Sequence, residues 1–88
     1  MVTYSVQKEI FVNYTLSSVS LVAPVANMMD GLKHLSDINE FAKTIPELAN
    51  YKEKKVSESG TKITFYLDGN VVVRYKIIKH VIEYSYGK

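Results

Sequence analysis

The segment that decides the fold spans residues 35–48 and reads LSDINEFAKTIPEL. Ser36 is a residue type favoured at a helix N-cap, and Asp37 and Glu40 put negative charge near the positive end of the helix dipole. Apolar side chains then recur at helical spacing on one face: Ile38, Phe41, Ala42 and Ile45. Pro46 disfavours helical geometry at the residue before it. The sequence therefore predicts a short helix over residues 36–45, which packing must hold in place.

Before this segment, residues 2–16 alternate between apolar and polar side chains. The apolar face is Val2, Tyr4, Val6, Ile10, Val12, Tyr14 and Leu16, interrupted only by Lys8. The opposite face is polar except for Phe11. A period of two predicts a β-strand with one buried face, and its length predicts a bend near residues 7–9.

Residues 17–31 allow two interpretations. In the first, Ser17-Ser18 caps a helix whose apolar residues follow three- and four-residue spacing, namely Val19, Val22, Ala26 and Met29. Pro24 then either kinks this helix or lies near its first turn, and Asp30-Gly31 ends it. In the second, Ser17-Ser18 is a hairpin turn that pairs Leu16 with Val19 and Tyr14 with Leu21. We favour the helix, because neither serine favours the positive φ of a tight hairpin turn.

Residues after Pro46 are typical of β-hairpins. Residues 50–57 are either a charged helical turn or an edge strand protected by lysines. We favour the strand, because residues 58–60 form a turn that leads into alternating residues 61–68 and a hairpin partner must precede that turn. A three-residue loop, Asp68-Gly69-Asn70, then sets the next register. It pairs Phe65 with Val73 and Ile63 with Tyr75, whereas a two-residue loop would put Arg74 on the core face.

The end of the chain again leaves two alternatives open. A turn at Lys79-His80 would pair Ile77 with Ile82 and Tyr75 with Tyr84, and would set Lys76 opposite Glu83. Alternatively, residues 71–86 form one continuous strand with a bulge at Ile77-Ile78. Either way, residues 1–88 form a single α+β domain: an antiparallel β-sheet with two short helices packed on one face, in the order β-α-α-β-β-β-β.

Composition indicates a chain that needs a partner. Hydrophobic residues make up 47% of the sequence, ten residues are aromatic, and there is no cysteine to form a disulfide or a thiolate metal site. A domain of this size buries only roughly 60–65% of the surface of its unfolded chain, so its stability margin is thin and we expect a homodimer. Abundant Lys, Ile and Tyr without Cys is also typical of thermophile proteins.

Net charge and the pattern of apolar residues exclude some partners and locations. The net charge of +2 is too small to indicate nucleic acid by itself, although residues 51–88 hold eight basic and four acidic groups. No apolar run is long enough to span a membrane, and no basic region followed by an apolar core marks a secretion signal. We therefore expect a cytoplasmic protein that does not bind membranes.

No catalytic arrangement is visible in the sequence, so we expect no enzyme activity, no cofactor and no metal. His34 and His80 are the only imidazoles, and neither has metal-ligand spacing to another ligand type. Asp37 and Glu40 are explained as helix-end charges. An alternative function comes from the outer face of the 61–77 hairpin, where Lys62, Tyr66, Arg74 and Lys76 interleave basic and aromatic groups. Such a face can bind single-stranded nucleic acid, but an ordinary solvated surface also explains it.

With the 35–48 segment placed, the chain resembles START-like, Bet v 1-type (SRPBCC) domains, and in particular the first part of the START-like domains associated with carbon monoxide dehydrogenase. The matching residues are Val19, Leu35-Ser36-Asp37, Phe41, Ile45-Pro46 and Leu48, followed by the hairpins at Gly60-Thr61 and residues 68–70. The arrangement would be a truncated helix-grip, because no segment matches that family's long C-terminal helix and extra residues separate the first helix from Leu35.

The resemblance implies a cavity for an apolar small molecule between helices and sheet. The residues expected to line it are Met28, Met29, Phe41, Phe65, Val73 and Tyr75, although core packing also explains the two methionines. The family shares no universal catalytic residues. The predicted function is therefore a non-enzymatic binding or scaffold domain that forms a homodimer, with ligand binding as the weaker part of the prediction.

Overall fold

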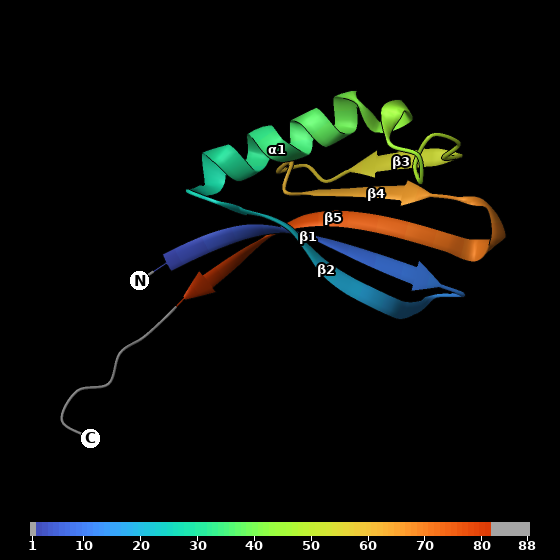
Figure 1. The fold of residues 1–88 in the computed structure, drawn as a ribbon, viewed down its shortest axis with the longest axis horizontal. Coiled ribbons are helices and arrows are strands. Elements are labelled where there is room, and N and C mark those ends of the chain that lie inside the picture. Colours follow the sequence, from blue (N-terminus) through green and yellow to red (C-terminus); the bar gives the residue numbers. More distant parts are fainter. Residues whose placement is uncertain (1, 82–88) are drawn as a thin grey trace, which may run out of the picture.

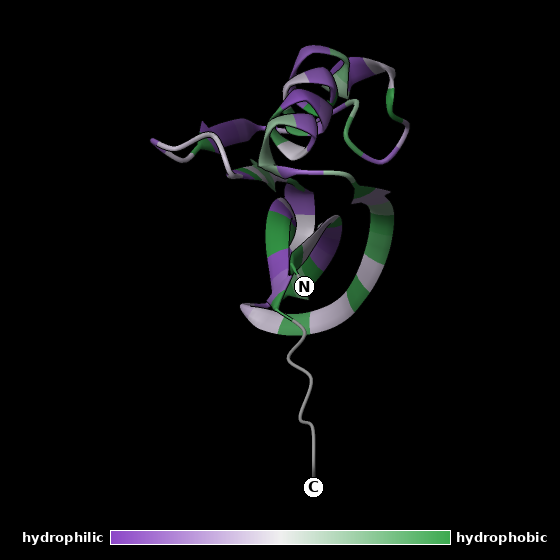
Figure 2. Cartoon of the chain, turned by 90° about the vertical axis from the view of Figure 1, so that its left-hand side faces the viewer, coloured by the Kyte–Doolittle hydropathy of each residue, from purple (hydrophilic) through white to green (hydrophobic). Residues whose placement is uncertain are grey.

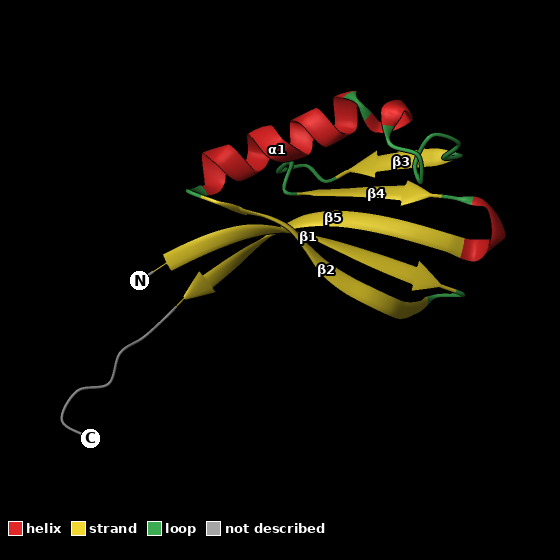
Figure 3. Cartoon of the chain, viewed as in Figure 1, coloured by secondary structure: helices red, strands yellow, loops and turns green. Residues whose placement is uncertain are grey.

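The computed structural model describes residues 2–81, which form one antiparallel sheet with a helix across one face (Figure 1). The sheet order is β2-β1-β5-β4-β3. The strands are β1 (Val2–Val12), β2 (Thr15–Val25), β3 (Glu53–Val56), β4 (Lys62–Tyr66) and β5 (Val71–Val81). The predicted α+β class and antiparallel sheet are confirmed. The prediction of two helices is wrong, because the described residues contain one α-helix, α1 (Met28–Glu40), and two short 3₁₀ turns (Figure 3).

The helix predicted after Ser17-Ser18 is replaced by β2. Val19 pairs with Glu9 of β1, and Pro24 lies within the strand opposite Ser5. Proline is tolerated there because β2 is at the edge of the sheet, where its missing N–H costs no ladder hydrogen bond. The rival interpretation of a hairpin was right in kind but placed the turn wrongly. The turn is Asn13-Tyr14, and its φ values of 51° and 68° are those of a type I′ turn.

The ladder between β1 and β2 contains two register shifts. One lies between Val6 and Gln7, beside the predicted bend at residues 7–9, and the other lies between Ile10 and Phe11. Each shift leaves one residue of β2 without a partner, namely Val22 and Ser17. Bulges of this kind bend a strand and increase its twist. They account for the arc that β2 makes away from α1 (Figure 2).

Helix α1 begins earlier and ends earlier than the sequence predicted. Asn27 is its N-cap, with a side chain that accepts a hydrogen bond of 2.9 Å from the N–H of Asp30. Ser36 is therefore inside the helix. Asp37 and Glu40 fall in its last turn, where negative charge opposes the helix dipole. The prediction that these carboxylates stabilise a helix start is wrong, as is the prediction that Asp30-Gly31 ends a helix.

The core lies between α1 and the three central strands. Its buried residues are Val6, Leu35, Ile38, Ala42, Leu48, Ile63, Phe65, Val73 and Tyr75. The aromatic rings of Tyr51, Phe65 and Tyr75 pack edge to face. Strand β2 contributes no fully buried residue to this core. The helix therefore covers mainly the β1-β5-β4 part of the sheet, with Val25 at the end of β2 packed against the core.

The 50–57 strand and the three-residue loop are confirmed. Strand β3 occupies residues 53–56, and β4 pairs with β5 so that Phe65 faces Val73 and Ile63 faces Tyr75. Gly69 and Asn70 take positive φ values of 74° and 59°, which these two residue types tolerate.

The turn predicted at residues 79–80 is wrong. Strand β5 continues through Val81 and pairs with β1 without a shift at residues 77–78, because β1 is long enough to partner all of it. The predicted pairings of Ile82, Glu83 and Tyr84 lie outside the described residues. Within residues 2–81, no helix has the length and apolar character needed to cross a membrane.

Candidate functional site

Two surfaces of the sheet are left uncovered by α1. We call the first the open face: the side of the sheet opposite α1, formed by the residues that alternate with the core positions. Its central residues are Glu9, Phe11, Thr64, Tyr66, Val72, Arg74 and Lys76. Side chains directly opposite one another in an antiparallel ladder share a face. Leu16, Val19 and Leu21 of β2 therefore belong to the open face as well, since they oppose Phe11, Glu9 and Gln7.

A buried carboxylate organises the centre of the open face. Glu9 is 7% exposed, and its two carboxylate oxygens lie 2.6 Å from Arg74 Nη2 and 3.1 Å from Lys76 Nζ. Burial alone would raise the pKa of Glu9. The hydrogen bonds and positive charges of Arg74 and Lys76 together outweigh that effect, so the pKa of Glu9 is lowered from its ordinary value. The two cations are thus largely compensated by a group of the protein itself.

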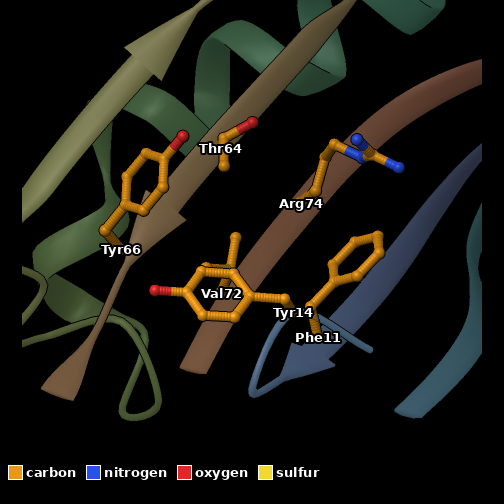
Figure 4. Close-up of a pocket in the computed structure, with 6 residues that line it drawn as sticks. All are labelled: Phe11, Tyr14, Thr64, Tyr66, Val72 and Arg74. Atoms are coloured by element: carbon orange, nitrogen blue, oxygen red, sulfur yellow. The ribbon is translucent and has the colours of Figure 1, made fainter. Parts of the chain in front are cut away.

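Aromatic side chains surround a shallow hollow beside this cluster. The hollow has a volume of about 260 Å³ and is lined by Phe11, Tyr14, Thr64, Tyr66, Val72 and Arg74 (Figure 4). The guanidinium of Arg74 lies 4.8 Å from the centre of the Phe11 ring, and Lys55 Nζ lies 5.5 Å from the centre of the Tyr66 ring. The hollow therefore combines aromatic rings with positively charged groups that lie over two of them.

Tyr14 reaches this hollow from a strained position. It is the second residue of the type I′ turn, with a φ of 68°, and it is 88% exposed. A non-glycine residue in left-handed geometry has a free-energy cost of about 1–2 kcal/mol, and Tyr14 gains no burial that would offset it. Such strain is often found where a side chain has a role at the surface.

The second uncovered surface is the β2 edge, which is the outer side of residues 15–25. Residues 10–29 carry no charged side chain. Along β2, Leu16 is 47% exposed, Val19 is 50% exposed and Leu21 is 62% exposed. Figure 2 shows β2 in green and pale tones only, whereas β3 at the other edge is mostly purple.

The two edge strands of the sheet differ sharply in how well they are protected against pairing with a strand of another chain. Strand β3 reads Glu53-Lys54-Lys55-Val56, so three of its four residues are charged. Charged side chains, especially lysine, prevent the unpaired backbone groups of an edge from joining another strand. Strand β2 has almost three times the length of β3 and none of this protection.

A groove also runs between α1 and the β3–β4 hairpin. It has a volume of about 270 Å³ and is lined mostly by apolar side chains: Leu32, Leu35, Ser36, Asn39, Val56, Gly60 and Ile63. Asn39 Oδ1 is buried and has no hydrogen-bond partner among the described residues. A buried acceptor without a partner is costly.

The six residues predicted to line a ligand cavity are divided between the core and the surface. Phe65, Val73 and Tyr75 are buried in the core. Met28, at the start of α1, is half-buried, whereas Met29 is 74% exposed and Phe41, just after the end of α1, is 54% exposed. None of the six lines the open-face hollow or the α1 groove. Their core members instead fill the space between helix and sheet.

One of those core residues belongs to a polar cluster. Tyr75 Oη donates to Glu47 Oε1 at 3.4 Å, and Lys8 Nζ lies 2.8 Å from the same oxygen. Burial, followed by the nearby negative charge of Glu47, raises the pKa of Tyr75 to about 12. The phenol therefore stays protonated and acts as a donor within the core.

The four residues of the nucleic-acid alternative lie on one face. Lys62, Tyr66, Arg74 and Lys76 all alternate with core positions on β4 and β5. The sequence interpretation missed Phe11, Tyr14 and the apolar residues of β2, which join the same face only once the β1–β2 hairpin forms. The signal that could have located them is Asn13, a residue type common in type I′ turns.

The two histidines lie on different elements. His34 lies on α1, and His80 lies on β5, where its Nε2 is 3.1 Å from Ser5 Oγ. No group of three His, Cys, Asp or Glu side chains within residues 2–81 has the geometry to hold a metal ion.

Comparison with known proteins gave no match to any family model, curated protein or solved structure. Function is therefore inferred from the geometry of the open face and the β2 edge.

Proposed function

We propose that this chain is a non-enzymatic binding and scaffold domain that works as a homodimer, with its interface on β2. The observation that carries the proposal is the uncovered apolar row formed by Leu16, Val19 and Leu21 on an unprotected edge strand. Exposed apolar side chains that gather on one element mark interaction sites more often than isolated ones do. The internal ion pairing of Glu9 supports a structural rather than catalytic role for the polar centre of the face.

The free energy gained by burying this row indicates what kind of interface it can make. Fully burying a Val or Leu side chain contributes about 1.5–3 kcal/mol, so each half-exposed residue of the row would contribute about 1 kcal/mol. Two copies of the row would supply about 6 kcal/mol, against an association cost of about 4–15 kcal/mol. Apolar contact alone is therefore marginal. A stable dimer needs the backbone hydrogen bonds of the edge in addition.

A matched pair of variants tests the proposal. Val19 on β2 is 50% exposed and Val56 on β3 is 47% exposed, so Val19→Lys and Val56→Lys make the same change at opposite edges. We expect Val19→Lys to convert the dimer to a monomer in size-exclusion chromatography with light scattering, and Val56→Lys to leave the dimer intact. Equal behaviour of the two variants would contradict a β2 interface.

Binding of an apolar small molecule is the weaker part of the proposal. The α1 groove supports it best, because its lining is mostly apolar. An apolar molecule would suit this lining. Native mass spectrometry of freshly purified protein tests it, since a retained ligand adds a defined mass. Leu32→Trp, which narrows the groove, should abolish that added mass.

A second candidate function is the binding of single-stranded nucleic acid by the open-face hollow. The hollow supports it because Phe11, Tyr14 and Tyr66 offer rings for stacking, with Arg74 and Lys62 nearby. The pairing of Arg74 and Lys76 with Glu9 weighs against it, since both cations are already compensated. Filter binding across a salt series tests this function. If the chain contacts phosphates, its affinity for single-stranded nucleic acid should fall steeply as the salt concentration rises. Tyr66→Ala should weaken binding at every salt concentration.

Membership of the START-like superfamily also stands as a proposal, with the cytoplasm as the expected location. A helix packed across an antiparallel sheet supports it. The position of Val19 in a strand weighs against it, because the family pattern puts this valine in a helix. A crystal structure with an apolar ligand in the α1 groove would support membership of this superfamily.

A further inference from the structure

We infer that the β2 strands of two copies pair edge to edge in antiparallel orientation, across a two-fold axis near Ser20, and so join the two five-stranded sheets into one. The inference rests on the proposed homodimer and specifies its geometry. It concerns how the two copies meet: through a continuous backbone ladder, with the apolar row beside it.

The backbone of β2 is the first reason. An edge strand presents one row of N–H and C=O groups that its own sheet leaves unpaired. Strand β2 has 11 residues, or about 37 Å at about 3.4 Å per residue. Pro24 cannot donate a hydrogen bond, so the usable ladder ends near Ala23. The remaining residues are enough for a strand pair of ordinary length.

The absence of charge on β2 is the second reason, and it identifies the partner as another copy of this chain. Two-fold antiparallel pairing sets residues of one strand opposite residues of the same strand. A charged strand would therefore oppose its own charges, and like charges in opposite positions are destabilising. Strand β3 would bring its two lysines together in this way, whereas residues 10–29 contain no charge at all.

The side-chain pattern selects the register. Between the two register shifts, Ser18–Leu21 pairs regularly with β1 and alternates between the faces of the sheet. If the axis passes beside Ser20, then Val19 of each copy opposes Leu21 of the other on the open face, and the two Ser20 residues oppose each other on the α1 side. If the axis passes beside Val19 instead, Leu21 opposes Ser17. The first register pairs Val19 with Leu21, the most exposed residue of the row, and sets Ser18 opposite Val22, which has no partner in the β1 ladder. The second leaves Leu21 opposite a serine, so we choose the first.

This arrangement determines the shape of the dimer. A two-fold axis perpendicular to the sheet keeps both helices on one side and both open faces on the other. The apolar row of each copy then lies at the centre of a continuous surface, where the two rows lie side by side and shield each other laterally. The two aromatic hollows flank this centre and remain accessible, so any ligand of the open face would meet two copies of its site.

Disulfide trapping tests the register directly, because the chain contains no cysteine. In an antiparallel ladder, opposite Cα atoms lie about 4.5–5.5 Å apart, which is within the range that a disulfide spans. Ser20→Cys should therefore give a covalent dimer as the main species after mild oxidation. Val19→Cys should give little, because two Val19 residues would be diagonal rather than opposite. Lys55→Cys, on the other edge, is the control for random collision and should also give little.

The possible results separate the inference from the proposed function. Crosslinking of Ser20→Cys well above the Lys55→Cys control supports the inference. A non-covalent dimer by light scattering that crosslinks through Val19→Cys, or through neither β2 variant, overturns the inferred pairing and leaves the homodimer standing. A monomer for all three reduced variants and for the unmodified chain overturns both. Circular dichroism of each variant confirms that the exposed substitutions leave the fold intact.

Discussion

At the scale of single residues, the chain keeps a tyrosine where the backbone favours glycine. Tyr14 is held at a φ of 68° in the turn between β1 and β2 while its side chain is almost wholly in solvent. Packing does not explain this arrangement, so Tyr14 is best understood as part of the open-face hollow that its ring helps to line.

Replacement of Tyr14 by glycine should therefore stabilise the fold. We expect Tyr14→Gly to raise the free energy of unfolding by about 1 kcal/mol, since glycine adopts positive φ without strain. Urea denaturation of the purified variant measures the change. Tyr14→Phe keeps the strain and serves as the control, with no change expected. A loss of stability in Tyr14→Gly would show that the Tyr14 side chain makes stabilising contacts.

The second residue-scale prediction concerns Glu9 and pH. Because the pKa of Glu9 is lowered in the folded state, the folded protein binds fewer protons than the unfolded chain near pH 4. The stabilisation is present above the ordinary glutamate pKa of about 4.3 and is lost as the pH falls through the lowered value.

Glu9→Gln isolates this contribution. We expect the variant to lose about 1–2 kcal/mol at pH 7, because Arg74 and Lys76 lose a charged hydrogen-bond partner. Its stability should also fall less than that of the unmodified chain between pH 5 and pH 3. Urea unfolding at several pH values gives both numbers. Parallel pH profiles for the two proteins would contradict the role assigned to Glu9.

At the scale of elements, the charges in the last turn of α1 interact unfavourably with the helix dipole. Its last turn contains Asp37 and Glu40 and no basic residue, so negative charge lies at the negative end of the helix. Exposed Glu40 offers a simple test. Glu40→Lys should raise the free energy of unfolding by about 0.3–1 kcal/mol, and the gain should shrink in high salt. Thermal denaturation at low and high salt measures it, and a gain that is independent of salt would point to another cause.

The elements also show what the sequence could and could not predict. The β4–β5 hairpin was predictable to the residue, because only a three-residue loop keeps Arg74 off the core face. Strand β2 was not, because its two register shifts break the period of two. Val19 and Val22 are three residues apart, which imitates helical spacing, and the strand accommodates this spacing because Val22 lies at a register shift.

The start of α1 was missed for a different physical reason. Gly31 resembles a helix stop in the sequence, but in the structure it lets α1 approach β5 closely. A Cβ atom at Gly31 would lie 3.0 Å from Ile77 Cδ1, a contact between distant segments that no local pattern contains. The same limit applies to the candidate site. Hairpin register put Lys62, Tyr66, Arg74 and Lys76 on one face, but the apolar half of that face needed the missed β2 strand.

At the scale of the whole molecule, the two edges of the sheet differ in charge and in their protection against strand pairing. The lysine-rich β3 edge resists strand pairing, and the long uncharged β2 edge invites it. Helix α1 covers the centre of the sheet, and β2 contributes no fully buried residue to the core. The proposed homodimer would bury part of this apolar surface, and the proposal attaches the expectation from composition to β2.

The most direct test of this account is sedimentation equilibrium of the unmodified chain at micromolar concentrations. The account predicts a species of twice the 10.0 kDa chain mass, which dissociates on dilution as a monomer–dimer equilibrium. A single species of 10.0 kDa at every concentration up to the solubility limit would contradict it, because β2 would then remain an exposed apolar edge without a partner.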